Sequence, residues 1–89
     1  MGRRHEIQQL RQELERLMTP LVESMSAELE PKDKETLIDF IGNYEYGVAL
    51  EWLYSIVVER SIHLTLMQQQ EIQRLAQRMG IDLSQFENK

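Results

Sequence analysis

The side chains that could carry out catalysis are few in this chain, and they do not converge. The chain has two histidines and no cysteine, and neither histidine has partners at metal-binding spacing. His5 lies near the start of the chain, and His63 lies in a short segment between two predicted helices. We interpret both as ordinary surface or linker residues, so the sequence predicts neither a metal site nor a catalytic histidine.

Carboxylates and glycines give no stronger signal of chemistry. Glu13 and Glu15 point to different sides of a predicted helix, which argues against a paired general acid and base. The glycines are isolated at positions 2, 42, 47 and 80, so they form no phosphate-binding loop. We therefore expect no enzymatic activity, no cofactor, and no catalytic, cofactor-binding or metal-binding residues.

The charge and the hydropathy of the chain disfavour two further classes of ligand. The net charge is -5, from 15 acidic and 10 basic residues, and the arginines are scattered. Direct binding of nucleic acid needs a clustered basic face instead. No apolar run approaches the roughly 18 residues of a membrane span, and the start of the chain lacks the apolar stretch of a signal peptide. We expect a cytoplasmic protein that binds neither nucleic acid nor a membrane.

The spacing of apolar residues predicts an all-α fold, a single domain over residues 1–89 built as a small bundle of four to five helices. The first predicted helix covers about residues 4–29. Its apolar stripe contains Leu10, Leu14, Leu17, Leu21 and Met25. Pro20 lies inside this segment, and a proline in a helix interior costs about 3 kcal/mol. We therefore expect a break before it, with Thr19 capping a second short helix that starts at Pro20.

The same stripe is also compatible with a coiled-coil seam that would make a homodimer. Two heptads is short for such a seam, and any helix packed on a bundle shows this pattern, so we favour packing within one chain. The methionines have a similar pair of interpretations, as an adaptable binding groove or as core filler, and we favour core filler. This set contains Met18, Met25, Met67 and Met79.

Pro31 predicts the start of the next helix, and a corner follows at Gly42 and Asn43. The residues of this helix expected to face inward are Leu37, Ile38, Phe40, Ile41 and Tyr44. A longer helix over about 45–60 should bury one arc of its surface. That arc contains Tyr46, Ala49, Leu50, Leu53, Ile56 and Val57.

The last main helix is predicted from its ends. Thr65 is the expected N-cap, and Gly80 is expected to end the helix after Met79 in a left-handed conformation. One further turn, capped by Asp82, can follow. The predicted core face of this helix contains Ile72, Leu75, Ala76 and Met79, and its glutamines at positions 68–70 are interpreted as a solvated surface.

The outward side of the helix over 45–60 is neither plainly polar nor plainly apolar. An aromatic side chain among carboxylates is typical of an interface with a basic partner. Alternatively, the tryptophan tucks under the first helix and the glutamates only keep the surface soluble. We expect the corner to add acidic residues of the preceding helix to the same surface. The predicted partner-binding residues are Glu35, Asp39, Glu45, Val48, Glu51, Trp52, Ser55 and Glu59.

Residues 43–53, which read Asn-Tyr-Glu-Tyr-Gly-Val-Ala-Leu-Glu-Trp-Leu, resemble the small immunity proteins of the Maf type, related to those of contact-dependent growth inhibition systems. Ile62, Leu64-Thr65, Ile72, Leu75-Ala76 and Met79-Gly80-Ile81-Asp82 continue the resemblance. It covers about residues 43–82, and its most specific part is the Glu-Tyr-Gly-x-Ala-Leu-Glu element. The first helix shows no such motif and is interpreted as part of the common fold or as a variable extension.

The resemblance implies a small helical protein that holds the C-terminal domain of a secreted toxin inactive inside the producing cell. In this family the toxin domains are often RNases, including the EndoU type. The element around Gly47 also has a structural interpretation, in which this glycine lets a neighbouring backbone approach closely.

The sequence is compatible with two functions. The first is immunity by stoichiometric binding of a basic nuclease domain, as a monomer in a 1:1 complex. The alternative is a helical adaptor or a dimeric regulator, whose seam is the first helix and whose partner is not a toxin. A neighbouring reading frame for a large secreted protein with a variable C-terminal domain would favour the first function.

Overall fold

The computed structural model describes residues 2–86, with side chains from residue 8 onward. The side chain of His5 lies outside the described part. Four α-helices are followed by a short 3-10 helix, and no strand occurs among residues 2–86. This confirms the predicted all-α bundle. The elements are α1 (Gly2–Ser24), α2 (Pro31–Gly42), α3 (Tyr46–Glu59), α4 (Leu66–Met79) and the 3-10 helix η1 (Leu83–Phe86).

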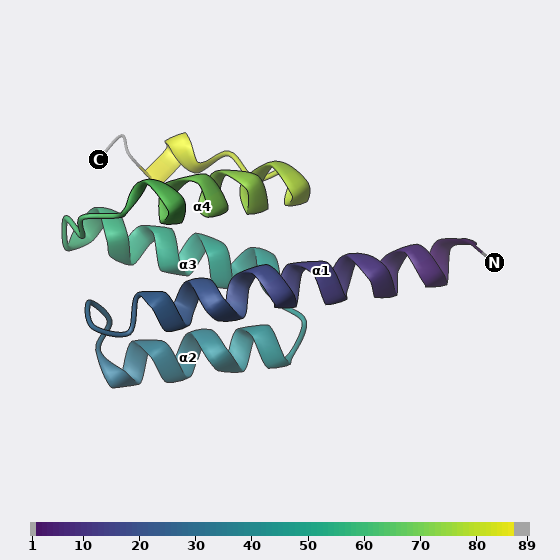
Figure 1. Ribbon diagram of the computed structural model, residues 1–89, viewed down its shortest axis with the longest axis horizontal. Coiled ribbons are helices and arrows are strands. Elements are labelled where there is room, and N and C mark those ends of the chain that lie inside the picture. Colours follow the sequence, from purple (N-terminus) through teal and green to yellow (C-terminus); the bar gives the residue numbers. More distant parts are fainter. Residues whose placement is uncertain (1, 87–89) are drawn as a thin grey trace.

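Successive helices run in opposite directions, so the bundle has an up-and-down arrangement (Figure 1). α1 packs against α2 on one side and α4 on the other, and α3 packs against α2 and α4. The N-terminal part of α1 extends past the ends of its neighbours (Figure 1). The molecule is therefore elongated, with extents of 44 × 26 × 21 Å.

The core is made by one face of each helix. All six residues predicted to form the core arc of α3 are buried, which confirms the orientation of that helix. Leu14 and Leu21 of α1 are buried as well, and Leu10 and Leu17 pack partly buried against the core. The apolar stripe of α1 is therefore a packing face of the bundle. Side chains with no exposure to solvent are Met18, Leu21, Met25, Leu37, Ala49, Leu50, Leu53 and Leu75.

The predicted break at Thr19 is wrong. α1 continues through Pro20 and ends at Ser24, before the predicted end at 29. Thr19, Pro20 and Arg16 are exposed. The Arg16 carbonyl, which loses its helical partner at the proline, thus lies on the solvent side of the helix. Buried Met18 and Leu21 anchor the helix on both sides of the proline, so tertiary packing overrides the local preference for a break.

Two residues predicted to face inward from α2 are exposed instead. Leu37 and Ile41 point into the core, whereas Ile38 is 46% exposed and Tyr44 is 59% exposed. Ile38 follows Leu37 by one position, about 100° around the helix, and so falls outside the buried arc. Tyr44 lies beyond the end of α2, and its left-handed backbone (φ 62°) turns it outward.

The corner between α2 and α3 begins at the predicted Asn43, after Gly42 ends α2, and extends to Glu45. Its left-handed residue is Tyr44. Asn43 closes α2, because its side-chain amide donates a hydrogen bond to the carbonyl of Asp39 at 2.9 Å. The Glu45 N–H then donates to the carbonyl of Phe40 at 2.8 Å, which ties the start of α3 to the end of α2.

Both predicted ends of α4 are confirmed. Thr65 and Gln68 form a capping box, in which each side chain bonds the backbone N–H of the other. Gly80 ends the helix with φ 67°. The Gln68 amide also donates to Ser24 Oγ at 3.1 Å, so it links α4 to the end of α1 rather than being only solvated. The prediction of core filler fails for Met67, which is 69% exposed.

The predicted role of Gly47 is wrong. A Cβ at this position would meet only the side chain of Ile81, at an ordinary contact distance of 3.6 Å. Within residues 2–86, no backbone approaches closely enough to require a glycine there. The further turn after α4 is present as η1, where Asp82 Oδ1 accepts hydrogen bonds from the Ser84 N–H at 3.0 Å and from Ser84 Oγ at 2.6 Å.

Candidate protein-binding surface

The outward side of α3 carries most of the predicted partner-binding residues. Five of them lie within an arc of about 100° opposite the core, given 3.6 residues per turn. We call this surface the α3 face, and it contains Val48, Glu51, Trp52, Ser55 and Glu59. Val48 is 45% exposed, Glu51 and Glu59 are exposed, and Trp52 and Ser55 are partly buried. The face therefore combines apolar and acidic groups that are accessible together.

Trp52 is held in place by an aromatic neighbour from α2. Its ring meets the ring of Phe40 edge to face, with centroids 6.2 Å apart and an interplanar angle of 71°. Such a pair stabilises the contact beyond the area that it buries. Trp52 thus packs against α2, and the alternative in which it tucks under the first helix is not what the structure shows. Sequence reasoning placed Phe40 only in the core and missed its role as the support of Trp52.

Ser55 contributes little hydrogen-bonding capacity to the α3 face. Its hydroxyl donates to the carbonyl of Trp52 at 2.7 Å, within the same helix. A hydroxyl engaged in this way has no donor left for a partner but still has an accepting lone pair. We therefore regard Ser55 as a spacer between Trp52 and Glu59.

The acidic residues around the α3 face are free of ion pairs with the described side chains. Glu51 and Glu59 form none, and neither does Glu45, the N-cap residue of α3. Arg60 follows Glu59 in the chain, but its guanidinium binds Asp33 at 2.9 Å and also lies 3.5 Å from Glu30. The charges of Glu51 and Glu59 thus remain available to a basic partner.

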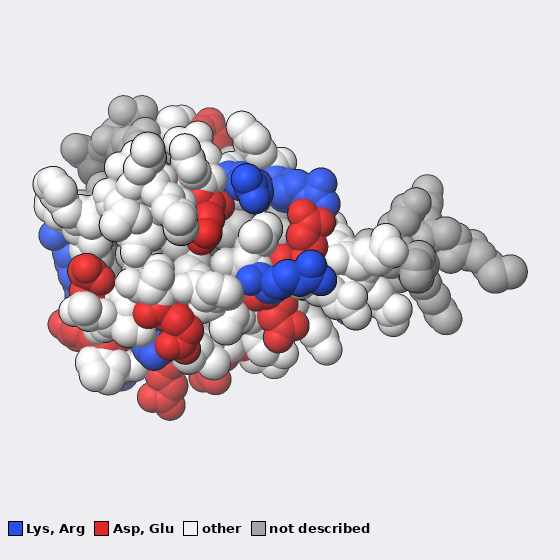
Figure 2. Space-filling view, viewed as in Figure 1, with Lys and Arg blue, Asp and Glu red and all other residues white. Residues whose placement is uncertain are grey.

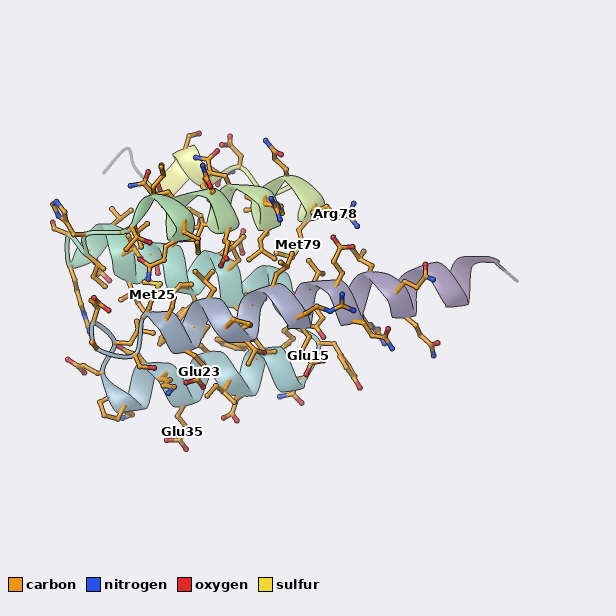
Figure 3. The ribbon with its side chains drawn as sticks, viewed as in Figure 1. Glu15, Glu23, Met25, Glu35, Arg78 and Met79 are labelled. Carbon is orange, nitrogen blue, oxygen red and sulfur yellow. The ribbon has the colours of Figure 1, made fainter. Side chains whose placement is uncertain are left out.

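The predicted gathering of acidic residues at the corner is only partly present. Asp39 and Glu45 lie on either side of the corner and are exposed. Glu35 stays apart, because it lies five positions and about 140° around α2 from Phe40, the residue that marks the side facing α3. Its side chain points away from the bundle (Figure 3). The structure thus leaves Glu35 outside the surface around Trp52.

The structure also bears on the predictions about histidine, metal binding and membrane spans. His63 is exposed in the segment between α3 and α4. Among the described residues, no group of three or more histidine, cysteine, aspartate or glutamate side chains is placed to hold a metal ion. In the same part of the chain, no helix is both long enough and apolar enough to cross a membrane.

The charged side chains are mixed rather than segregated on the side of the bundle where α1 lies in front. Lysines and arginines lie beside aspartates and glutamates on this side (Figure 2). Two of these contacts are ion pairs between helices, from Lys34 to Glu23 at 3.1 Å and from Arg78 to Glu13 at 2.6 Å. All four side chains are substantially exposed to solvent, so each pair contributes about 0 to 1 kcal/mol.

Comparisons of the chain with protein-family models, with curated proteins and with solved structures find no match.

Proposed function

We propose that this protein is an immunity protein that binds the C-terminal nuclease domain of a toxin made in the same cell. It holds that domain inactive in a one-to-one complex, in the cytoplasm. The observation that carries the proposal is the α3 face, where a half-exposed valine and a tryptophan supported by Phe40 lie among carboxylates that form no ion pair with the described side chains.

The chemistry of the α3 face fits a basic partner. An RNA-cutting domain has to attract phosphate, so its substrate surface is basic and is electrostatically complementary to exposed glutamates. The net charge of -5 would steer the two proteins toward each other. The resemblance of residues 43–82 to Maf-type immunity proteins names the class of partner, and the α3 face lies within those residues.

One form of the alternative function, a dimeric regulator with α1 as its seam, is not supported by the packing of α1. Leu14 and Leu21 of its stripe are buried in the core of its own chain, and Leu17 packs partly buried against that core. A coiled-coil partner would have to displace α2 and α4 to reach it. We therefore retain the immunity function and do not propose dimerisation through α1.

The first experiment tests the function itself. The chain is co-expressed with the toxin domain encoded by the neighbouring reading frame, and growth is compared with expression of the toxin domain alone. We expect the chain to restore growth, because binding occupies the toxin domain before it cuts RNA. Failure to restore growth, with both proteins present at similar levels, would contradict the proposal.

The second experiment tests the surface, with surface plasmon resonance against the same domain at two salt concentrations. The variant Trp52→Ala should dissociate faster from the toxin domain, and its binding free energy should weaken by about 2 kcal/mol. The reason is that it removes an aromatic anchor that Phe40 holds in place. Combined reversal of Asp39, Glu51 and Glu59 to lysine should slow association and reduce the dependence on salt, since exposed charges act mainly on encounter.

Matched controls lie on α4, which packs against α1 and α3. Met67→Ala removes an exposed apolar side chain, and Glu71→Lys reverses a charge outside the α3 face. Both should bind like the wild type, and circular dichroism should show that every variant keeps its helical content. If growth is restored but Trp52→Ala and the triple reversal also bind like the wild type, the immunity function stands and the interface lies elsewhere.

A further inference from the structure

A hollow of about 300 Å³ lies between α1 and α2. Its apolar floor is formed by Val22 and Ile41, which are buried, and the half-exposed Ile38 stands at its edge on α2. Next to Ile41, a Cβ added at Gly42 would meet no atom within 4 Å, so the hollow is open at that end. Ile38 is thus an aliphatic side chain beside an apolar floor that no other described element covers.

The rim of this hollow on α1 is acidic. Glu15 and Glu23 line it, and both project from α1 on the side of α2 (Figure 3). Glu23 forms an ion pair with Lys34 at 3.1 Å, whereas Glu15 forms no ion pair with any described side chain. The carboxylate of Glu15 therefore stands unneutralised beside an apolar floor.

A second hollow, of about 380 Å³, continues the first along α1. It is lined by Tyr44, by Tyr46 at the start of α3 and by residues of α1 from Gln8 to Glu15, so Glu15 lines both hollows. We call the two hollows together the track. From Gln8 to Glu23 the track follows about 22 Å of α1, at 1.5 Å per residue, which matches about four turns of a second helix.

Two features mark the Tyr44 end of the track. The Arg11 guanidinium lies over the Tyr44 ring, 4.6 Å from its centroid, so its charge is held against an aromatic face. The Tyr46 hydroxyl is buried and has no hydrogen-bond partner among the described residues. Burial and the charge of Glu15 both raise the pKa of Tyr46 above its ordinary value.

We propose that the track is a docking site for an amphipathic, basic helix of a partner protein. The helix lies along α1, places an aliphatic side chain on Ile38, Val22 and Ile41, and directs a lysine or arginine to Glu15. The apolar floor of the first hollow excludes charge, and the unpaired carboxylate of Glu15 attracts a cation.

The track is separate from the α3 face. Ile38 and Phe40 are two positions apart and so point to nearly opposite sides of α2. The inference goes beyond the proposed function and does not depend on it. Restoration of growth through the α3 face and binding of a helix in the track are measured in separate experiments. Either result can therefore be obtained without the other.

The test uses the whole chain labelled with ¹⁵N and a synthetic peptide of about four helical turns, with leucines on one face and lysines on the other. We expect the peptide to shift the amide signals of Thr19, Val22, Ile41 and Gly42. A second peptide, with glutamate in place of every lysine, should leave these signals unchanged because it repels Glu15.

Two variants with matched exposure locate the contact. Ile38→Ser and Val48→Ser each remove a half-exposed aliphatic side chain from a helix, at 46% and 45% exposure. We expect Ile38→Ser and Glu15→Gln to raise the Kd of the basic peptide about tenfold, and Val48→Ser and Glu51→Gln to leave it unchanged. Circular dichroism should be the same for all four variants, since each residue is exposed.

The outcomes that overturn the inference are specific. The first is that the basic peptide does not bind. The second is that its shifts fall on the α3 face, at Trp52 and Glu59, rather than in the track. The third is that the acidic peptide binds equally well. The fourth is that Val48→Ser weakens the basic peptide as much as Ile38→Ser does.

Discussion

Leu53 and Val48 lie on the same helix in opposite environments. Leu53 has no exposure to solvent and belongs to the core, whereas Val48 is 45% exposed on the α3 face. In such a small domain, whose total stability is about 4 to 13 kcal/mol, a single core residue carries a large fraction of the free energy of unfolding. These two residues therefore test the orientation of α3.

We expect Leu53→Ala to lower the free energy of unfolding by about 2 to 5 kcal/mol, because it leaves a cavity in a closed core. Val48→Ala should change it by no more than about 0.5 kcal/mol, as a surface substitution does. Urea denaturation followed by circular dichroism measures both values. Equal effects of the two substitutions would show that α3 is rotated relative to its position here.

Asp82 provides a residue-scale test of a local contact. Hydrogen bonds from the Ser84 side chain and backbone hold the pKa of this carboxyl below its ordinary value. A depressed pKa in the folded state contributes stability above the unfolded pKa of about 3.9, and this contribution is lost as the pH falls through the folded pKa.

Ser84→Ala should therefore raise the pKa of Asp82 toward its ordinary value, because the side-chain hydrogen bond is its largest cause. A carboxyl ¹³C titration by nuclear magnetic resonance measures the shift. We expect the variant to lack the stability that this contact provides above about pH 4, and to lose less stability than the wild type as the pH falls below that value. An unchanged pKa would mean that the contact with Ser84 is not formed in solution.

At the scale of the element, glycines lie at the ends of two helices in different backbone conformations. Gly80 ends α4 in a left-handed conformation, whereas Gly42 lies within the last turn of α2 and has no atom near its absent Cβ. The two positions call for opposite responses to the same substitution.

Gly80→Ala should destabilise the protein by about 1 kcal/mol, because a side chain is disfavoured at positive φ. Gly42→Ala should stabilise it by about 0.4 to 1 kcal/mol, because alanine restricts the unfolded chain and meets no neighbour in the folded one. Thermal unfolding of the two variants measures the difference. A stabilising Gly80→Ala would show that α4 ends elsewhere.

The elements that could be predicted from the sequence are those whose signals are local. The core arc of α3, the capping box at Thr65 and the end of α4 at Gly80 follow from spacing and from single residue types, and the structure confirms them. The continuity of α1 through Pro20 could not be predicted in this way, because it depends on buried contacts with other helices. The same holds for Ile38, whose exposure is decided by how α1 lies across α2.

The candidate surface was predictable to the same degree. The helical period of α3 groups Val48, Glu51 and Trp52 without any knowledge of the fold. It does not show that Phe40 braces Trp52, or that Glu35 points away, since both depend on the rotation of α2 about its own axis.

At the scale of the molecule, α1 is both the longest helix and the one that closes the core. Its buried stripe contacts its own chain, and the large exposed apolar residues are distributed over different elements: Ile38, Tyr44, Val48, Leu66 and Met67. Single apolar residues on a surface are common in monomeric proteins.

We therefore expect sedimentation equilibrium to give the mass of one chain over a wide range of concentration. The physical reason is that the side chains of α1 described from residue 8 onward leave no continuous apolar seam for a second copy. A mass of two chains that is lost in the variant Ile38→Ser would place a dimer contact in the track. A dimer insensitive to this substitution would require another surface.

Trp52 is the only tryptophan of the chain, so all of its indole fluorescence originates from the α3 face. The ring is partly buried beside Phe40 and therefore still meets water. A partner seated on the α3 face would remove that water and shift the emission to shorter wavelength. A helix bound in the track, on the other side of α2, would leave the surroundings of the indole unchanged. The protein thus carries an intrinsic optical reporter that distinguishes its two surfaces without a label.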